Sequence, residues 1–107
     1  MTIKPQHIPV LKQLKNCKTL TRRKKLLLAG GKEIQRVLRE IAYNILRGAV
    51  KLSKSQKKRL RKHQGAVRTI ALKKTPLRKR LSLEQRGGFL TALLAPLLAG
   101  VTSAVLR

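Results

Sequence analysis

The stretch Gln85-Arg86-Gly87-Gly88-Phe89 divides this chain into two parts of opposite character. Lys and Arg crowd the sequence before it, whereas no residue from Phe89 to Leu106 is charged. Two consecutive glycines at the boundary free the backbone from side-chain constraints, which favours a hinge or a helix end. The stretch therefore predicts a basic module joined to an apolar C-terminal segment.

Positive charge dominates the composition of the chain. Its 107 residues include 27 Lys and Arg but only 3 acidic residues, which gives a formal net charge of +24. This length suits one small domain. An isolated chain of such charge repels itself, whereas a polyanion relieves the repulsion and releases counterions. We therefore expect nucleic acid as the main partner and an anionic membrane as the second.

Side chains that carry catalysis or bind metals are scarce. The chain has no Asp, and its three Glu, two His and one Cys show no spacing typical of a nucleophile or a metal site. We therefore predict that the protein is not an enzyme and needs no cofactor or metal. Cys17 has no partner for an internal disulfide, so we expect a reduced thiol. The start Met1-Thr2-Ile3-Lys4-Pro5 lacks the apolar region of a secretory signal, so secretion is not expected.

Residues 1–31 are expected to form a basic N-terminal arm or a pro-segment. Pro5 and Pro9 predict an extended conformation for about the first ten residues. The pair Gly30-Gly31 should stop any helix that precedes it. Between these points runs a short helical stripe, formed by Val10, Leu11, Leu14, Cys17 and Leu20.

The clearest helical pattern covers Gly31 to Gly48. Glu40 is spaced for a helical ion pair with Arg36. For Tyr43 we favour packing at the edge of the apolar face over stacking on nucleic-acid bases. Apolar residues recur there at steps of three and four, on the face formed by Ile34, Val37, Leu38, Ile41 and Ile45.

A second helix is predicted over residues 54–73. Ser53 and Gln56 fit a capping box at its start, because each side chain can bond the other residue's backbone amide. Gly65 should weaken the middle of this helix. His63 is expected to face solvent or phosphate.

A third, short helix is predicted downstream. Thr75 fits its N-cap and Pro76 its first position, and the helix should reach about Gln85. Because no strand pattern or repeat is persuasive, the predicted fold class is all-α. We expect a small cluster of short basic helices with a C-terminal apolar helix and an extended N-terminal arm. Residues 32–88 would form the basic helical module that binds nucleic acid.

The densest positive charge lies between Lys51 and Arg80, where no acidic residue occurs. Cations on most of a helix surface suit phosphate contacts, which do not depend on base sequence. Single-strand recognition needs aromatic platforms, and only Tyr43 and Phe89 are available. We therefore predict non-specific binding and condensation of double-stranded DNA, with a solvated surface or a nuclear localisation signal as the alternative. The candidate phosphate-binding residues are Lys51, Lys54, Lys57, Lys58, Arg59, Arg61, Lys62, Arg68, Lys73, Lys74, Arg78, Lys79 and Arg80.

Residues 89–107 form an apolar tail. As a helix, Phe89–Leu106 would be about 27 Å long, at the short limit for crossing a bilayer. Pro96 and Gly100 predict a kink in its middle. Three interpretations stay open: a membrane-inserting segment, an anchor that docks into a groove of a protein assembly, and a core helix of this small domain. The candidate residues for docking to membrane or capsid are Phe89, Leu90, Leu93, Leu94, Leu97, Val101 and Val105.

The boundary between module and tail also resembles a viral family. The junction Arg86-Gly87-Gly88-Phe89-Leu90 and the following Leu93-Leu94-Ala95-Pro96-Leu97-Leu98-Ala99 are similar to the C-terminal part of the adenovirus core protein X precursor, also called pre-mu. In that family an Arg-rich, DNA-condensing segment precedes an Arg-Gly-Gly junction and an apolar tail with Leu and Pro. Similar small basic proteins occur in adintoviruses and in Maverick or Polinton elements. The resemblance covers about the last quarter of the chain, and it implies a location in the virion and the host nucleus.

Proteolytic maturation is a second implication of the resemblance. Adenovirus-type cysteine proteases cut after Met/Ile/Leu/Asn/Gln-X-Gly-Gly, a form that Leu28-Ala29-Gly30-Gly31 and Gln85-Arg86-Gly87-Gly88 both fit. A pair of helix ends or hinges is the structural alternative for both dipeptides. The implied cuts lie between Gly31 and Lys32 and between Gly88 and Phe89.

These features together predict a virion core or minor capsid protein. Its basic module would bind and condense double-stranded DNA, its tail would dock to capsid proteins or a membrane, and a viral cysteine protease would cleave it. Two alternatives stay open: a membrane-active or tail-anchored basic protein, and a cellular nucleic-acid-binding protein of the ribosomal or chromatin type.

Overall fold

Helices form all the regular secondary structure in the computed structural model, whose described residues are 4–86 and 88–106, with side chains as far as Leu98. The predicted all-α class is therefore confirmed. The Cα radius of gyration is 12.8 Å and the extents are 36 × 26 × 25 Å. The elements are η1 (Pro5–His7), α1 (Ile8–Asn16), α2 (Leu20–Leu46), α3 (Lys54–Arg61), α4 (Gln64–Ala71), α5 (Leu77–Glu84) and α6 (Phe89–Leu106).

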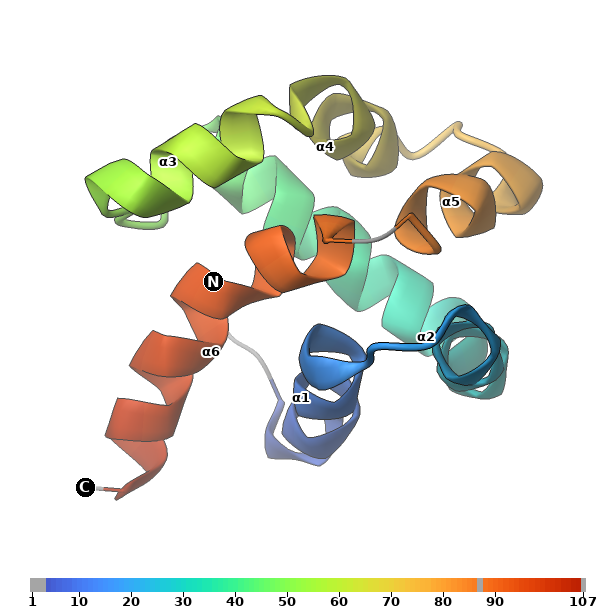
Figure 1. The fold of residues 1–107 in the computed structure, drawn as a ribbon, viewed down its shortest axis with the longest axis horizontal. Helices are drawn as coiled ribbons and strands as arrows, with labels where there is room; N and C mark the ends of the chain where they lie inside the picture. The colour runs from blue at the N-terminus through green and yellow to red at the C-terminus, as the bar shows by residue number, and fades with distance from the viewer. Residues whose placement is uncertain (1–3, 87, 107) are drawn as a thin grey trace.

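The long helix α2 is the element around which the others are arranged (Figure 1). α4 packs along α2, and α6 packs mainly against α1 and α3. The hydroxyl of Thr91 on α6 donates to the carbonyl of Lys15 on α1 at 2.8 Å. Helices from the two ends of the chain therefore lie side by side.

α2 consists of two helical segments joined by a kink at Gly31. This residue has φ 58° and ψ −149°, which lies outside the helical region and favours glycine. The interruption predicted at Gly30-Gly31 is thus confirmed as a kink, although the helix resumes at once. In the second segment the predicted apolar face turns inward, with Ile34, Leu38 and Ile41 at most 3% exposed.

Residues 54–73 form two helices instead of the single helix predicted. The capping box at the start of α3 is confirmed: the Gln56 amide donates to Ser53 Oγ at 3.2 Å, and the Ser53 amide donates to Gln56 Oε1 at 2.8 Å. The break between α3 and α4 lets α3 pack on α6 while α4 packs on α2. His63, at this break, is half-buried, with its ring centroid 5.6 Å from that of Phe89. His63 therefore keeps part of the solvent exposure predicted for it, while its ring also lies near Phe89.

α5 begins one position later than predicted. Pro76 is its N-cap, with φ −62° and ψ 149°, and the helix starts at Leu77. Thr75, the predicted N-cap, instead donates its hydroxyl to the carbonyl of Thr69 at 2.7 Å. This hydrogen bond ties the connection between α4 and α5 to the end of α4.

The first described residues are helical, so the extended arm predicted there was wrong. Pro5 and Pro9 occupy first-turn positions of η1 and α1, where a missing amide hydrogen costs no helical bond. Leu11 and Leu14 of α1 are at most 1% exposed and belong to the hydrophobic core. The boundary proposed at residue 31 therefore does not separate a free arm from the module, and residues 1–3 lie outside the described residues.

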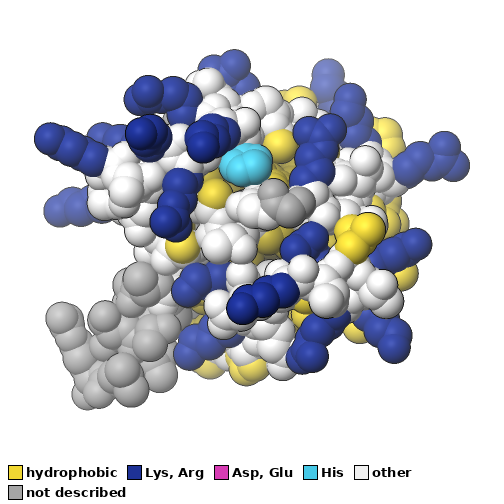
Figure 2. Space-filling view, viewed as in Figure 1, with side chains coloured by type: hydrophobic (Ala, Val, Ile, Leu, Met, Phe, Trp, Pro, Cys, Tyr) yellow, Lys and Arg dark blue, Asp and Glu magenta, His cyan; other side chains and the backbone are white. Residues whose placement is uncertain are grey.

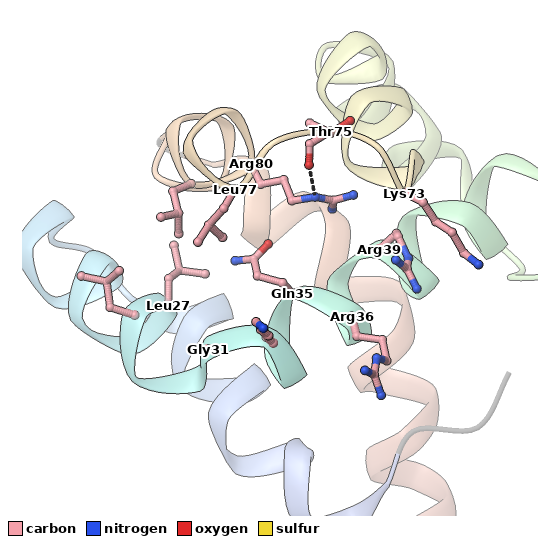
Figure 3. A pocket seen from close by; sticks show the side chains of 12 residues that line it. Leu27, Gly31, Gln35, Arg36, Arg39, Lys73, Thr75, Leu77 and Arg80 are labelled. Carbon is pink, nitrogen blue, oxygen red and sulfur yellow. Dashed lines mark hydrogen bonds between the residues drawn. The ribbon is translucent and has the colours of Figure 1, made fainter.

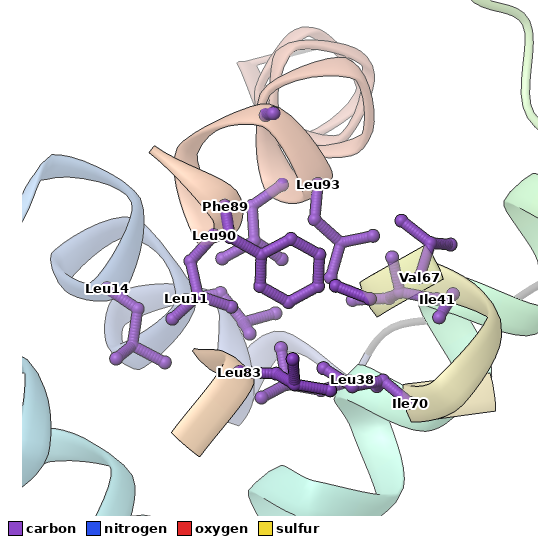
Figure 4. Close-up of a cluster of buried hydrophobic side chains, with 14 of the residues drawn as sticks. Leu11, Leu14, Leu38, Ile41, Val67, Ile70, Leu83, Phe89, Leu90 and Leu93 are labelled. Atoms are coloured by element: carbon purple, nitrogen blue, oxygen red, sulfur yellow. The ribbon is translucent and has the colours of Figure 1, made fainter. Parts of the chain in front are cut away.

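The first half of α6 occupies the centre of the hydrophobic core (Figure 4). Its side chains pack among residues of α1, α2, α4 and α5, because these helices present their apolar stripes to the same interior. Burial at this position contradicts a docking role for four of the predicted residues. Each of the four is at most 1% exposed: Phe89, Leu90, Leu93 and Leu94.

The rest of α6 continues through Pro96 to Leu106. Leu97 is half-buried against the core, so it offers only part of its surface. The side chains of Val101 and Val105, also predicted to dock, lie outside the described residues. Among the residues that the structure describes, no helix combines the length and hydropathy required to cross a membrane.

Candidate nucleic-acid interface

The cations predicted to contact phosphates come mainly from α3, α4, α5 and the segments between them. Lys and Arg side chains project over these helices on the face drawn in Figure 2. Of the thirteen candidates, all but Arg80 are exposed. The exposed set is Lys51, Lys54, Lys57, Lys58, Arg59, Arg61, Lys62, Arg68, Lys73, Lys74, Arg78 and Lys79.

The positive charge of this interface is not compensated by carboxylates. Across the part of the chain with described side chains, no Lys or Arg nitrogen lies within 4.0 Å of a Glu oxygen. The ion pair predicted between Arg36 and Glu40 is therefore not formed. Glu33 instead lies beside His7, with 2.8 Å between Oε1 and Nε2, and the interaction with His7 lowers the pKa of Glu33. The exposed cations thus remain available to an external polyanion.

The acidic residue Glu84 is buried between α2 and α5. It is 0% exposed, and the Gln35 side-chain amide donates to its Oε1 at 2.7 Å. Burial raises the pKa of Glu84 to about 7, and the hydrogen bond from Gln35 and the charge of Arg80 oppose that rise. Because Glu84 is buried, its carboxyl does not compensate the charge of the exposed cations on α3, α4 and α5.

Arg80 stabilises the fold and is not part of the interface, which corrects the sequence prediction. Its side chain is 5% exposed, and burial lowers the pKa of the guanidinium. Nη1 donates to the carbonyl of Ile70 at 2.7 Å, Nε donates to that of Thr75 at 3.1 Å, and Nη2 donates to that of Leu72. The last carbonyls of a helix have no partner within it, so Arg80 caps the end of α4.

Arg23 has a similar structural role that the sequence patterns did not reveal. Its Nη1 donates to the carbonyl of Gln85 at 2.6 Å and its Nη2 to that of Cys17 at 3.1 Å. The side chain is 8% exposed. Its two hydrogen bonds connect the start of α2 to the end of α5. The sequence did contain a signal for this role of Arg23. The residue lies four positions before the buried Leu27 and so on the same, inward helical face.

Tyr43, predicted to pack at the edge of the apolar face, is mostly exposed. It is 52% exposed, and the guanidinium carbon of Arg47 lies 5.6 Å from the centroid of its ring. The pair forms a cation–π contact on the surface, four residues apart on the same helix. An exposed aromatic ring beside a cation is thus present next to the basic segment.

The two Gly-Gly dipeptides differ in their surroundings. Leu28 is 56% exposed, and Gly31 and Lys32 are exposed as well. Gly88 has φ 83°, but the following Phe89 is 0% exposed. The bond after Gly31 is therefore at the surface, whereas the bond after Gly88 leads directly into the core.

Within residues 4–86 and 88–98, no group of three His, Cys or Glu side chains is placed to hold a metal ion. The chain matches no protein-family model, no curated protein and no solved structure. The arguments for function therefore rest on the interface itself and on the sequence features described above.

Proposed function

We propose that this protein binds double-stranded DNA through phosphate contacts, without base specificity, and helps to condense it. The observation that carries the proposal is the set of exposed cations between Lys51 and Lys79, which has no acid in its own segment. Neutralising phosphates with such cations releases condensed counterions, which drives binding independently of sequence.

The distribution of charge on α3 supports condensation in addition to binding. Leu60 is the buried residue of this helix, and its cations lie on the remaining sides. A short helix with charge on several sides can contact more than one duplex. Bridging of duplexes neutralises their mutual repulsion.

Salt titration tests the proposal directly. The full chain would be titrated with duplexes of equal length and different sequence at several salt concentrations. We expect similar affinities for all duplexes and a log–log slope of about −0.9 per neutralised phosphate. A flat salt response, or a strong preference for one duplex, would contradict the proposal.

Matched charge variants locate the interface. Replacing Arg59 and Arg61 with Gln should reduce the magnitude of the salt slope by the amount expected for about two lost phosphate contacts. The same change at Lys12 and Lys18, which are exposed but lie outside the basic segment, should have a smaller effect. Equal effects of the two pairs would indicate diffuse charge attraction without a located interface.

The resemblance to the core protein X precursor supports a virion core or minor capsid setting, with capsid proteins as neighbours. The alternative of a cellular ribosomal or chromatin-type protein would use the same cations. Docking to membrane or capsid through Phe89–Leu94 is not part of the proposal, because these positions belong to the core. Mass spectrometry of the protein from its native particle tests the setting, since a virion protein must be recovered with the packaged DNA.

Maturation cleavage after Gly-Gly belongs to the same proposal. In the folded protein an adenovirus-type cysteine protease should cut after Gly31 first, because Leu28 and Gly31 are exposed. Cleavage after Gly88 should require α6 to open, since Phe89 is buried. Timed digestion with mass spectrometry, with and without prior denaturation in urea, tests this order. Absence of cleavage at Gly31 in both conditions would leave that dipeptide as a kink alone.

A further inference from the structure

A cleft of about 440 Å³ lies between α2 and the segment that leads from α4 into α5 (Figure 3). α5 makes more contacts with α4 and α6 than with α2. The hydrogen bond from Gln35 to Glu84 connects α2 and α5 at the inner side of this cleft. The surface between them is therefore an open groove, which we call the α2–α5 cleft.

One end of the α2–α5 cleft is apolar. Leu27 and Leu81 line its interior, where Leu27 is 1% exposed and Leu81 is half-buried. Leu28 on α2 and Leu77 on α5 also line it, and each of them is 56% exposed. Adjacent exposed apolar side chains on two separate helices are typical of a surface that a partner covers.

The other end of the cleft is cationic. Arg36 and Arg39 on α2 and Lys73 before α5 gather there (Figure 3). Lys32 also lines the cleft, and no acidic residue does so. An occupant must therefore combine apolar side chains with negative charge, and must present them in that order along the groove.

We propose that the α2–α5 cleft binds an amphipathic helix from an acidic partner protein. Apolar side chains at helical spacing would cover Leu28 and Leu77, and carboxylates would lie beside Arg36 and Arg39. A second copy of this chain is disfavoured by its charge of +24. A DNA backbone would satisfy the cations but leave the exposed leucines in water. The cleft shares Lys73 with the proposed DNA interface, whereas the exposed leucines, Arg36 and Arg39 belong to the cleft alone.

A designed peptide provides the first test. The full chain is titrated with a fluorescent helical peptide that carries Leu at positions i, i+3 and i+7 and Glu on the flanking positions of the following turn. The control peptide has the same composition in scrambled order. At physiological salt, where loose charge attraction is screened, the ordered peptide should bind at least about tenfold more tightly. Equal binding of the two peptides would overturn the proposal.

Matched leucine variants provide the second test. The double variant Leu28→Ser with Leu77→Ser should weaken peptide binding about tenfold or more, because both side chains lose their apolar contact. Leu20→Ser with Leu72→Ser is the control, since these residues are similarly exposed, at 56% and 50%, outside the cleft. DNA affinity should be unchanged in both variants. Equal loss in the two variants, or weakened DNA binding only in the cleft variant, would refute the peptide site.

Discussion

Gln35 on α2 donates a hydrogen bond from its Nε2 to Oε1 of Glu84 on α5 at 2.7 Å, and both side chains are buried. The amide oxygen of Gln35 and the Oε2 atom of Glu84 have no hydrogen-bond partner. Both atoms are acceptors while Glu84 is ionised, but protonation converts the carboxyl into a donor as well. Neutral Glu84 is therefore better suited to this interior than the carboxylate, in agreement with its raised pKa.

The stability contribution of Glu84 should decline as the pH rises from about 4.5 to about 7. Its pKa is raised from 4.5 to about 7 because burial disfavours the charged form, so the folded state holds the proton more tightly. The stability contribution of Glu84 is complete at a pH below 4.5 and is lost at a pH above about 7. A shift of this size corresponds to about 3 kcal/mol.

The variant Glu84→Gln isolates this effect, because the amide stays neutral at every pH. Urea denaturation at pH 5 and pH 8 should show a smaller loss of stability in the variant than in the wild type. The pKa of Glu33 is lowered from 4.5, so this carboxyl is mostly ionised at both pH values and is also common to both proteins. An identical pH dependence of the two proteins would exclude Glu84 as the titrating group.

Arg80→Met should lower the free energy of unfolding by about 3 kcal/mol, because buried carbonyls at the end of α4 lose a charged donor. The exposed neighbour Arg78 is the matched control, and Arg78→Met should change stability by less than about 0.5 kcal/mol. The salt slope of DNA binding should respond in the reverse order, falling in Arg78→Met and not in folded Arg80→Met. Denaturation and salt titration of both variants check these outcomes. A reduced salt slope of DNA binding in Arg80→Met would show that Arg80 does contact DNA.

Gly30→Ala and Gly65→Ala should affect stability in opposite directions. A Cβ at residue 30 would clash with Cγ1 of Ile34 and lie 2.6 Å from its Cβ, so the kink must shift, at a cost of about 1–3 kcal/mol. A Cβ at residue 65 would meet no atom within 4 Å, and alanine should stabilise α4 by about 0.5–1 kcal/mol. Thermal denaturation of both variants measures the contrast. Equal changes in stability would show that the close approach of residue 30 to Ile34 does not affect stability.

Phe89→Ala should destabilise the fold by about 3–5 kcal/mol, because it empties a fully buried site in the core. Such a loss is a large part of the stability of a small domain, so the variant should be partly unfolded. Leu97→Ala, at a half-buried position on the same helix, is expected to cost less. Circular dichroism during heating distinguishes the two. An unchanged melting temperature in Phe89→Ala would mean that α6 is not integral to the core.

Short-range features of this fold were predictable. The capping box of Ser53 and Gln56, the inward face of Ile34, Leu38 and Ile41, and the interruption at Gly30-Gly31 all depend on residues within one helical turn or on one residue's own backbone freedom. The exposure of most cations was predictable too, because an unpaired charge is rarely buried. Two local predictions failed: the Thr75 hydroxyl bonds the carbonyl of Thr69 and does not cap α5, and Tyr43 lies at the surface beside Arg47.

The sequence by itself determined that this chain is helical, strongly basic and divided by charge at Gln85–Phe89. Only the tertiary structure decided what the division means. An apolar face on α6 suits a lipid, a partner groove or the chain's own interior equally well, and the choice depends on which distant helices offer matching apolar stripes. Because α1, α2 and α4 do so, Phe89 and its neighbours form the core. The same long-range packing buries Arg80 and Glu84, although neighbouring cations with the same chemistry remain at the surface.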